Sequence, residues 1–278
     1  MTPPLEQLAR DAADGDREAL DALVKAVQDD VYGLALRMLG VPPDAQDATQ
    51  EILVKVITHV GSYRGESAFR TWVWKIATRH ILKMRRGRYE STVDFASIEA
   101  LLDQGTGLPA STTDDAEVQR LADEVRLGCT QAMLVALDRD HRIVYVLGDV
   151  LGFSSDEASH VLDLDAATFR KRLQRARMRL GAFMRRKCGL VDPVAACRCV
   201  RQIPVLEGRG LLDPKRLTYS EHPVRSGSGA TIALAWSELT ELDTLTRTMR
   251  DVPSYGAPTA ILAALRQLLE SKRLRVLQ

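Results

Sequence analysis

Apolar side chains recur three and four positions apart along most of the chain, and this spacing predicts helices rather than strands. The first such stripe contains Leu20, Leu23, Val24, Val27, Val31, Leu34, Ala35 and Met38. Gly40, Pro42 and Pro43 interrupt it, because glycine and proline break helical patterns. The pattern then resumes in a helix that we expect from about Asp44 to positions 59–61.

The rest of the first two thirds of the chain follows the same rule. A further helix is expected after the turn at 62–67, and two more over 121–137 and 142–151. The segment 89–114 is instead rich in Ser, Thr, Gly and Asp, a composition typical of a linker. We therefore predict an all-α protein built from two helical domains that are joined by a linker.

A short helix and a long helix are predicted on either side of a tight turn. Ser154 and Glu157 have the spacing of a capping box, which predicts a helix over about 156–162. Asp165 can cap a second helix that begins near Ala166. Its apolar stripe is Phe169, Leu173, Ala176 and Leu180. Two helices with this connection form a helix-turn-helix, which presents the start of its second helix to the DNA major groove.

Charge is distributed very unevenly, although the formal net charge is only +1. Acidic residues dominate 1–51 and 90–124, whereas basic residues dominate 64–88 and 169–187. The last of these segments contains neither Asp nor Glu. Two basic surfaces separated by an acidic connector indicate a protein that contacts a polyanion at two places. The alternative for each basic segment is a solvated helix face.

The first basic segment also carries aromatic residues. Trp72 and Trp74 are two positions apart, so they cannot share one face of a helix. We expect at least one of them to be accessible, together with Tyr63. Exposed aromatic rings among basic side chains can stack on the bases of single-stranded nucleic acid. The alternative is that both tryptophans belong to the core.

Two classes of function are disfavoured by the sequence. No apolar run is long enough to span a bilayer and the first residues have no signal-peptide pattern, so we expect a cytoplasmic protein without a membrane partner. In the first 185 residues no set of His, Cys or carboxylate side chains has catalytic spacing. We therefore expect no enzymatic activity.

Three segments together resemble the extracytoplasmic-function (ECF) group of the sigma-70 family of transcription initiation factors. They read DAQDATQEILVKV, SYRGESAFRTWVWKIA and LGFSSDEASHVLDLDAATFRKRLQRARMRL. The resemblance covers roughly residues 5–185 in two blocks. It implies a sigma2-like domain at 1–89, an acidic linker at 90–120, a sigma4-like domain at 121–187 and a C-terminal extension at 188–278. The implied partners are core RNA polymerase and promoter DNA, with an anti-sigma factor as a further candidate.

The resemblance assigns roles to particular side chains. The family's polymerase-binding helix matches Asp47, Gln50 and Glu51. Contacts to the melted minus-ten promoter element are expected from Tyr63, Arg70, Trp74, Lys75, Arg79, Lys83 and Arg86. This sequence has Arg79 and His80 where Asn and a small residue are common in the family.

Recognition of the minus-thirty-five element falls to the second helix of the helix-turn-helix. The matching side chains are Thr168, Arg170, Lys171, Arg172, Gln174, Arg175 and Arg177. We expect Arg170 and Arg175 to contact bases, because Arg can bond two acceptors of guanine at once. Arg172 and Arg177 are expected to contact phosphates, which sets register without reading sequence.

The extension contains candidate metal ligands. Cys188, Cys197, Cys199 and His222 could hold zinc, since thiolates and imidazole are its preferred ligands. A redox-sensing thiol cluster and a structural role for small apolar side chains are the alternatives. Cys129 is distant in sequence and is expected to be a core residue. A sigma factor as such requires no cofactor.

Two amphipathic helices are predicted in the extension, one containing Leu239, Leu242, Leu245 and Met249, and one opened by Pro258. We expect them to pack on the sigma domains or on a partner, and to regulate the protein by holding the two domains in one arrangement. A merely stabilising appendage is the alternative. The rival functions are a metal- or thiol-responsive DNA-binding regulator and a stand-alone helix-turn-helix repressor.

Overall fold

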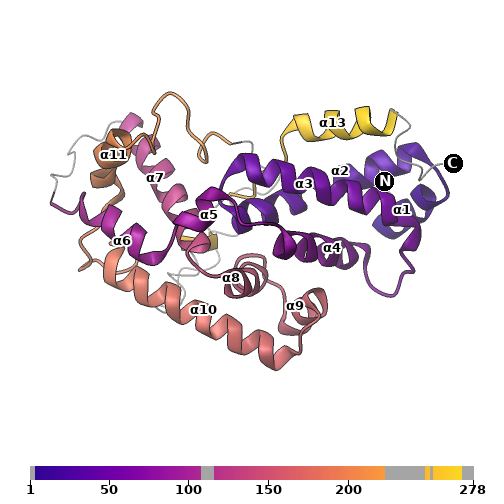
Figure 1. The fold of residues 1–278 in the computed structure, drawn as a ribbon, viewed down its shortest axis with the longest axis horizontal. Coiled ribbons are helices and arrows are strands. Elements are labelled where there is room, and N and C mark those ends of the chain that lie inside the picture. The colour runs from indigo at the N-terminus through magenta and orange to yellow at the C-terminus, as the bar shows by residue number, and fades with distance from the viewer. Residues whose placement is uncertain (1–3, 108–115, 223–247, 251–252, 271–278) are drawn as a thin grey trace.

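The computed structural model describes residues 4–107, 116–222, 248–250 and 253–270. The regular elements in these ranges are helices, which confirms the all-α prediction. They form a first bundle at the N-terminus and a second group of helices around the long basic helix, with the C-terminal segment running back over both (Figure 1). Among the described helices, none combines the length and the apolar character that crossing a bilayer requires.

The first bundle consists of α1 (Leu5–Ala13), α2 (Arg17–Leu39), α3 (Pro42–His59) and α4 (Phe69–Lys83). A short 3₁₀ turn, η1 (Val60–Ser62), follows α3. The helix expected from Asp44 begins two residues earlier, at Pro42. Proline suits the first helical position, because a backbone N–H there would have no partner within the helix. The core of the bundle is made by fully buried side chains, including Leu23, Leu34, Ile52, Leu53 and Phe69.

Gly40 is a junction between the two parts of the molecule. It ends α2 in the left-handed conformation, with φ of 87°, which a residue with a Cβ rarely adopts. A Cβ at this position would also lie 2.6 Å from the Cγ2 atom of Val135, which belongs to the second domain. The Gly40 carbonyl accepts a 2.7 Å hydrogen bond from the Tyr219 hydroxyl of the extension. Glycine is therefore required by conformation and by close packing at once.

The second domain contains α7 (Ala116–Val135), α8 (Arg139–Tyr145), the π-helical turn η2 (Val146–Val150), α9 (Ser155–Leu162) and α10 (Ala166–Lys187). The predicted caps are confirmed. Ser154 and Glu157 form both bonds of a capping box, and Asp165 accepts the Thr168 N–H at 2.8 Å. The helix-turn-helix is thus fixed by local hydrogen bonds at the start of each of its helices.

The connector is more structured than its composition indicates, with α5 (Arg88–Thr92) and α6 (Phe95–Asp103) inside it. Glu90, one of the acidic side chains of this segment, is only 7 % exposed. Its carboxylate accepts hydrogen bonds from Arg139 at 2.6 and 2.7 Å and from Arg142 at 3.2 Å. Burial alone would raise the pKa of Glu90, but these two guanidinium groups lower it. The acid therefore neutralises buried cations of the second domain.

The extension spans the two domains. Its helix α11 (Cys199–Gly208) packs on α7, and α13 (Thr259–Glu270) lies along the first bundle beside α3 (Figure 1). The predicted opening of the last helix at Pro258 is confirmed, with Ile261 and Leu265 buried. Of the other predicted helix, Leu239, Leu242 and Leu245 lie outside the described residues. We call residues 217–222 together with 253–270 the strap, because these segments contact both domains.

Candidate nucleic-acid interface

One face of α10 presents free polar and cationic side chains. Arg170, Lys171, Gln174 and Arg175 are exposed and recur at helical spacing, so they share one side of the helix. None of them forms an ion pair with another residue in the described part of the chain. Thr168 sits in the capped first turn. The opposite stripe, which begins with Phe169, is buried as predicted.

Other arginines of α10 have partners inside the molecule. Arg177 forms an ion pair with Asp149 at 2.5 Å, and Asp149 is only 3 % exposed. Hydrogen bonds to Asp149 raise the pKa of Arg177. Arg172 approaches Asp140 at 3.4 Å. These two side chains are thus positioned by carboxylates of the same domain, and their contact with phosphate stays a prediction.

The cationic face of α4 is occupied in a different way. Arg79 donates to Asp163 from Nη2 at 2.5 Å and from Nε at 3.2 Å, and Lys75 Nζ lies 3.5 Å from the same carboxylate. Asp163 is in the turn of the helix-turn-helix, where its φ of 53° ends α9. Burial would raise the pKa of Asp163, but Arg79 and Lys75 lower it. The second domain therefore neutralises two side chains that were predicted to contact minus-ten DNA.

The aromatic residues of α4 are also covered. Trp74 is only 8 % exposed, because α9 packs on α4 and brings Phe153 edge-on to its ring, with centroids 5.5 Å apart. Trp74 is thus not accessible in the arrangement seen here, and its contact with DNA stays a prediction. Trp72 is half-buried beside Tyr63 and Phe69. Tyr63 is half-buried as well, and its hydroxyl donates to the Ser67 carbonyl at 2.6 Å.

The remaining predicted minus-ten residues lie at the two ends of α4. Arg70 pairs with Asp30 of α2. Lys83 and Arg86 are exposed, and neither forms an ion pair with a described residue. This part of the cationic surface therefore stays open to solvent when the middle of α4 is covered.

The predicted polymerase-binding side chains lie on α3. Asp47 and Glu51 are exposed, whereas Gln50 is half-buried. Behind them, His80 lies with Nδ1 2.5 Å from Lys55 Nζ and with Nε2 3.4 Å from Glu51. Burial and the charge of Lys55 lower the pKa of His80, so its ring is neutral at pH 7. The polar face predicted from sequence is therefore available on the surface.

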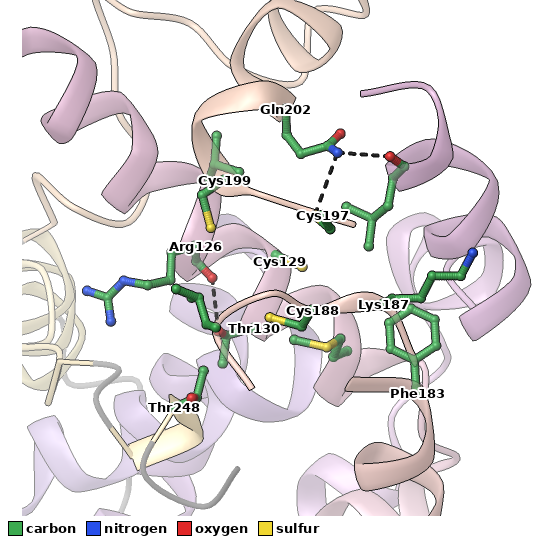
Figure 2. A pocket seen from close by; sticks show the side chains of 14 residues that line it. Arg126, Cys129, Thr130, Phe183, Lys187, Cys188, Cys197, Cys199, Gln202 and Thr248 are labelled. Atoms are coloured by element: carbon green, nitrogen blue, oxygen red, sulfur yellow. Dashed lines mark hydrogen bonds between the residues drawn. The ribbon is translucent and has the colours of Figure 1, made fainter. Parts of the chain in front are cut away.

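The four predicted metal ligands are not brought together. His222 stacks on Tyr32 and meets Tyr255 edge-on, each with centroids 5.3 Å apart, beside the first bundle. Cys188, Cys197 and Cys199 instead line a pocket in the second domain, together with Cys129 (Figure 2). Cys129 was expected to be an ordinary core residue, because about sixty positions separate it from the others. In the described part of the chain, no group of three or more His, Cys, Asp or Glu side chains is arranged to hold a metal ion as it stands.

Burial governs the chemistry of these thiols. Desolvation raises the pKa of Cys129 and Cys197, and that of Cys199 to about 12. A thiol with a raised pKa is protonated at pH 7 and is a poor nucleophile. Cys129, Cys197 and Cys199 therefore do not have the environment of reactive, peroxide-sensing residues.

Comparison with known proteins matches two separate regions of the chain to one family. The profile of Sigma-70 region 2 matches residues 23–90, and that of Sigma-70, region 4 matches residues 127–180. The chain is 34% identical over 178 residues to the ECF RNA polymerase sigma factor SigE of Mycolicibacterium smegmatis, covering 62% of this chain and 65% of that protein. It is 30% identical to the RNA polymerase sigma-H factor of Pseudomonas aeruginosa, covering 62% of this chain and 89% of that protein.

A solved structure also matches part of the chain. It is that of CnrH in complex with the cytosolic domain of CnrY, with a TM-score of 0.45 and 26% identity over 64% of this chain and 95% of that one. Both sigma-70 profiles end before residue 188, so the extension lies outside them.

Proposed function

Because the chain belongs to the extracytoplasmic-function group of the sigma-70 family, we propose that it binds core RNA polymerase, directs it to promoters and helps to open the DNA. The observation that carries this proposal is the pair of sigma-70 regions, matched in the family's order, in a chain whose α10 presents an unpaired cationic face. The proposed work needs no catalytic group, since binding energy drives DNA opening. We expect it to take place in the cytoplasm.

Two surfaces divide the proposed DNA contacts. Arg170 and Arg175 are suited to the edges of bases in the major groove of the minus-thirty-five element, with Lys171 and Gln174 beside them. The cations and aromatic rings of α4 are suited to the melted minus-ten element, where unstacked bases need flat partners. Asp47, Gln50 and Glu51 form the proposed contact with polymerase.

We propose that this arrangement is a closed state. Asp163 and Phe153 cover the middle of α4, so the second domain has to move away before Trp74, Lys75 and Arg79 can reach DNA. Polymerase, which offers separate sites to the two domains, would supply the binding energy for this movement. The closed state then lowers promoter use by the free protein.

The strap is the proposed regulator of this equilibrium. On the second domain, the buried Glu124 carboxylate accepts the backbone N–H groups of Thr218, Tyr219 and Ser220 at distances between 2.7 and 3.1 Å. A buried carboxylate that accepts several N–H groups is held strongly, because each bond is charge-assisted. We call this contact the Glu124 latch.

The same strap is fixed to the first domain at further points. The Ala257 N–H donates to Asp29 at 2.9 Å, Arg266 pairs with Asp21 at 3.2 Å, and Arg37 donates to the Pro253 carbonyl at 3.3 Å. A segment bound to both domains favours the arrangement that satisfies all its contacts together. The strap therefore stabilises the closed state at the expense of the open one.

Binding to core polymerase and run-off transcription test the proposal. The purified chain should co-purify with core enzyme and support transcripts from cognate promoters. Reversal of the charges of Asp47 and Glu51 should abolish co-purification without changing the helical content of the protein. If the chain binds duplex promoter sites without polymerase and ignores core enzyme, a stand-alone repressor is the better description. An anti-sigma partner stays a prediction, which a pull-down from the native organism addresses.

A further inference from the structure

All four cysteines of the chain line a single pocket (Figure 2). Met133 lines it as well. The pocket lies where the second domain meets the connector and the start of the extension. Cys129 comes from the middle of α7, Cys188 from the end of α10, and Cys199 from the first turn of α11. Residues from three separate segments of sequence thus place their thiols around one space.

The backbone around these thiols is held firmly. Cys188 and Cys197 are paired in a parallel bridge, in which Gly189 N–H donates to the Cys197 carbonyl at 3.1 Å and Cys197 N–H donates to the Lys187 carbonyl at 3.3 Å. Gln202 donates from Nε2 to the Cys197 sulfur at 3.6 Å and to the Leu102 carbonyl at 2.8 Å. The position of each thiol is therefore set by secondary structure, and what is left free is rotation about its χ1 angle.

The pocket's chemistry points to one class of ligand. Among the described residues that line it there is no carboxylate or imidazole, and its remaining walls are mostly apolar side chains such as Val125 and Phe183. Hard cations such as magnesium and calcium require oxygen ligands, whereas thiolates select zinc, cadmium and copper(I). Arg126 and Lys187 also line the pocket, and their charges are already paired, that of Arg126 with Asp123 and that of Lys187 with Glu99 and Asp103.

We propose that Cys129, Cys188, Cys197 and Cys199 bind one soft, thiophilic metal ion. Because no three of these groups converge on one point as they stand, binding requires the thiols to turn inward among their χ1 rotamers. Each thiol that becomes a ligand releases one proton, and no oxidant or reductant takes part. The site differs from the one expected from sequence, since Cys129 of α7 takes the place of His222.

The bound ion would fix the start of the extension to the sigma4-like domain, because Cys129 belongs to α7 and the other three ligands belong to the extension. Metal binding as such is independent of the proposed function. Only its consequence for transcription, which is a tighter closed state, rests on that proposal. Binding can therefore be tested with the isolated protein, without polymerase or DNA.

Titration of the reduced, metal-free full-length protein with cadmium is the direct test. We expect one ion per chain and the ultraviolet absorption of cadmium thiolates. Replacement of Cys129 by Ser should weaken cadmium binding by more than about 100-fold. Loss of a residue that only supports a metal ligand costs about 10- to 100-fold in affinity, so a larger loss identifies Cys129 as a ligand itself. His222→Gln is the matched control and should bind like the wild type. Circular dichroism identifies variants that fail to fold.

Alkylation of the unmodified chain gives a second measurement that needs no variant. With cadmium bound, all four thiols should be protected, Cys129 included, and removal of the metal with a chelator should restore their reaction. The proposal is overturned if Cys129 reacts at the same rate with and without cadmium, or if Cys129→Ser binds as tightly as wild type. It is also overturned if cadmium does not saturate, or if mass spectrometry shows that Cys188 and Cys197 form a disulfide that excludes the ion.

Discussion

The two cationic helices, α4 and α10, look alike in sequence but differ in what covers them. On α10, Arg170 and Arg175 point to solvent and pair with no described residue. On α4, Arg79 is neutralised by Asp163, and Trp74 is covered by Phe153. Under the proposed function, one DNA-binding surface is therefore ready for use, whereas the other becomes available only when the domains separate. Positive charge along a sequence identifies both surfaces, but only the packing of the domains distinguishes them.

The contacts between the domains differ in energetic weight. The ion pairs of Asp163 lie at the surface, where such a pair contributes only about 0–1 kcal/mol. The Trp74–Phe153 pair adds about 0.5–1.5 kcal/mol beyond its buried area. The Glu124 latch is buried, and unsatisfied buried groups cost about 1–3 kcal/mol each. The strap should therefore control the closed state more strongly than the visible salt bridges do.

The largest expected effect is on the open surface. Arg170→Glu or Arg175→Glu should lower promoter-dependent transcription by about 10- to 100-fold, because a lost bidentate base contact costs about 1–3 kcal/mol. Arg185→Glu, a reversal at an exposed position further along α10, is the control and should have a small effect. Run-off transcription with a fixed amount of core enzyme measures all three. Equal losses at Arg170 and Arg185 would contradict base reading by this face.

Release of the Glu124 latch should have the next largest effect. Glu124→Ala leaves the N–H groups of the strap without their acceptor, so the open population should rise about 10-fold or more. When core enzyme is limiting, run-off transcription with Glu124→Ala should therefore exceed that with the wild type. Asp123→Ala is the control, since this exposed neighbour approaches Arg126 of the same helix. A lower melting temperature without increased transcription would make the strap a stabilising appendage.

Removal of Phe153 should expose Trp74 more modestly. Phe153→Ala should raise the open fraction about 2- to 10-fold, in line with the energy of an aromatic pair. The open fraction is measured as acrylamide quenching of Trp74 fluorescence. The chain used for this measurement also carries Trp72→Phe and Trp236→Phe, so that Trp74 is its only tryptophan. Phe153→Leu keeps much of the apolar contact and should show less quenching. Unchanged quenching in the Ala variant would mean that α9 does not cover Trp74 in solution.

The smallest effect is expected at Asp163. Asp163→Asn removes the charge that holds Arg79 and Lys75 but keeps a side chain that tolerates positive φ, so the closed state should weaken by at most about 1 kcal/mol, or fivefold. Asp165→Asn is matched to it, because it removes one charge from the same turn and still caps α10. The difference in closed-state stability between Asp163→Asn and Asp165→Asn should vanish at high salt, because salt screens surface charges. A difference that persists in high salt would contradict a surface ion pair.

Local features of the fold were predictable from sequence. Caps at Ser154 and Asp165 act over three residues, so their hydrogen bonds can be read from spacing alone. The start of α13 after Pro258 belongs to the same category. The buried stripe of α10 was also predictable, because helical periodicity fixes which side chains share a face.

Features that depend on distant contacts were not predictable. Trp74 is buried by a residue of another domain, and Glu90 is buried because two arginines about fifty positions later need a counter-ion. Cys129 lies near the other thiols only through the packing of α7 on α11. His222, which the sequence predicts as a ligand only from its side-chain type, is held by aromatic rings of the first bundle and the strap instead.

Energy transfer between probes on the two domains tests the central idea most directly. Probes attached through unnatural amino acids at the exposed positions Glu66, before α4, and Asp156, on α9, report the separation of these helices. The free protein should show one high-efficiency population, Glu124→Ala should add a low-efficiency one, and core polymerase with promoter DNA should convert the whole sample to low efficiency. Efficiency that stays the same when polymerase and promoter bind would contradict a closed state that must open.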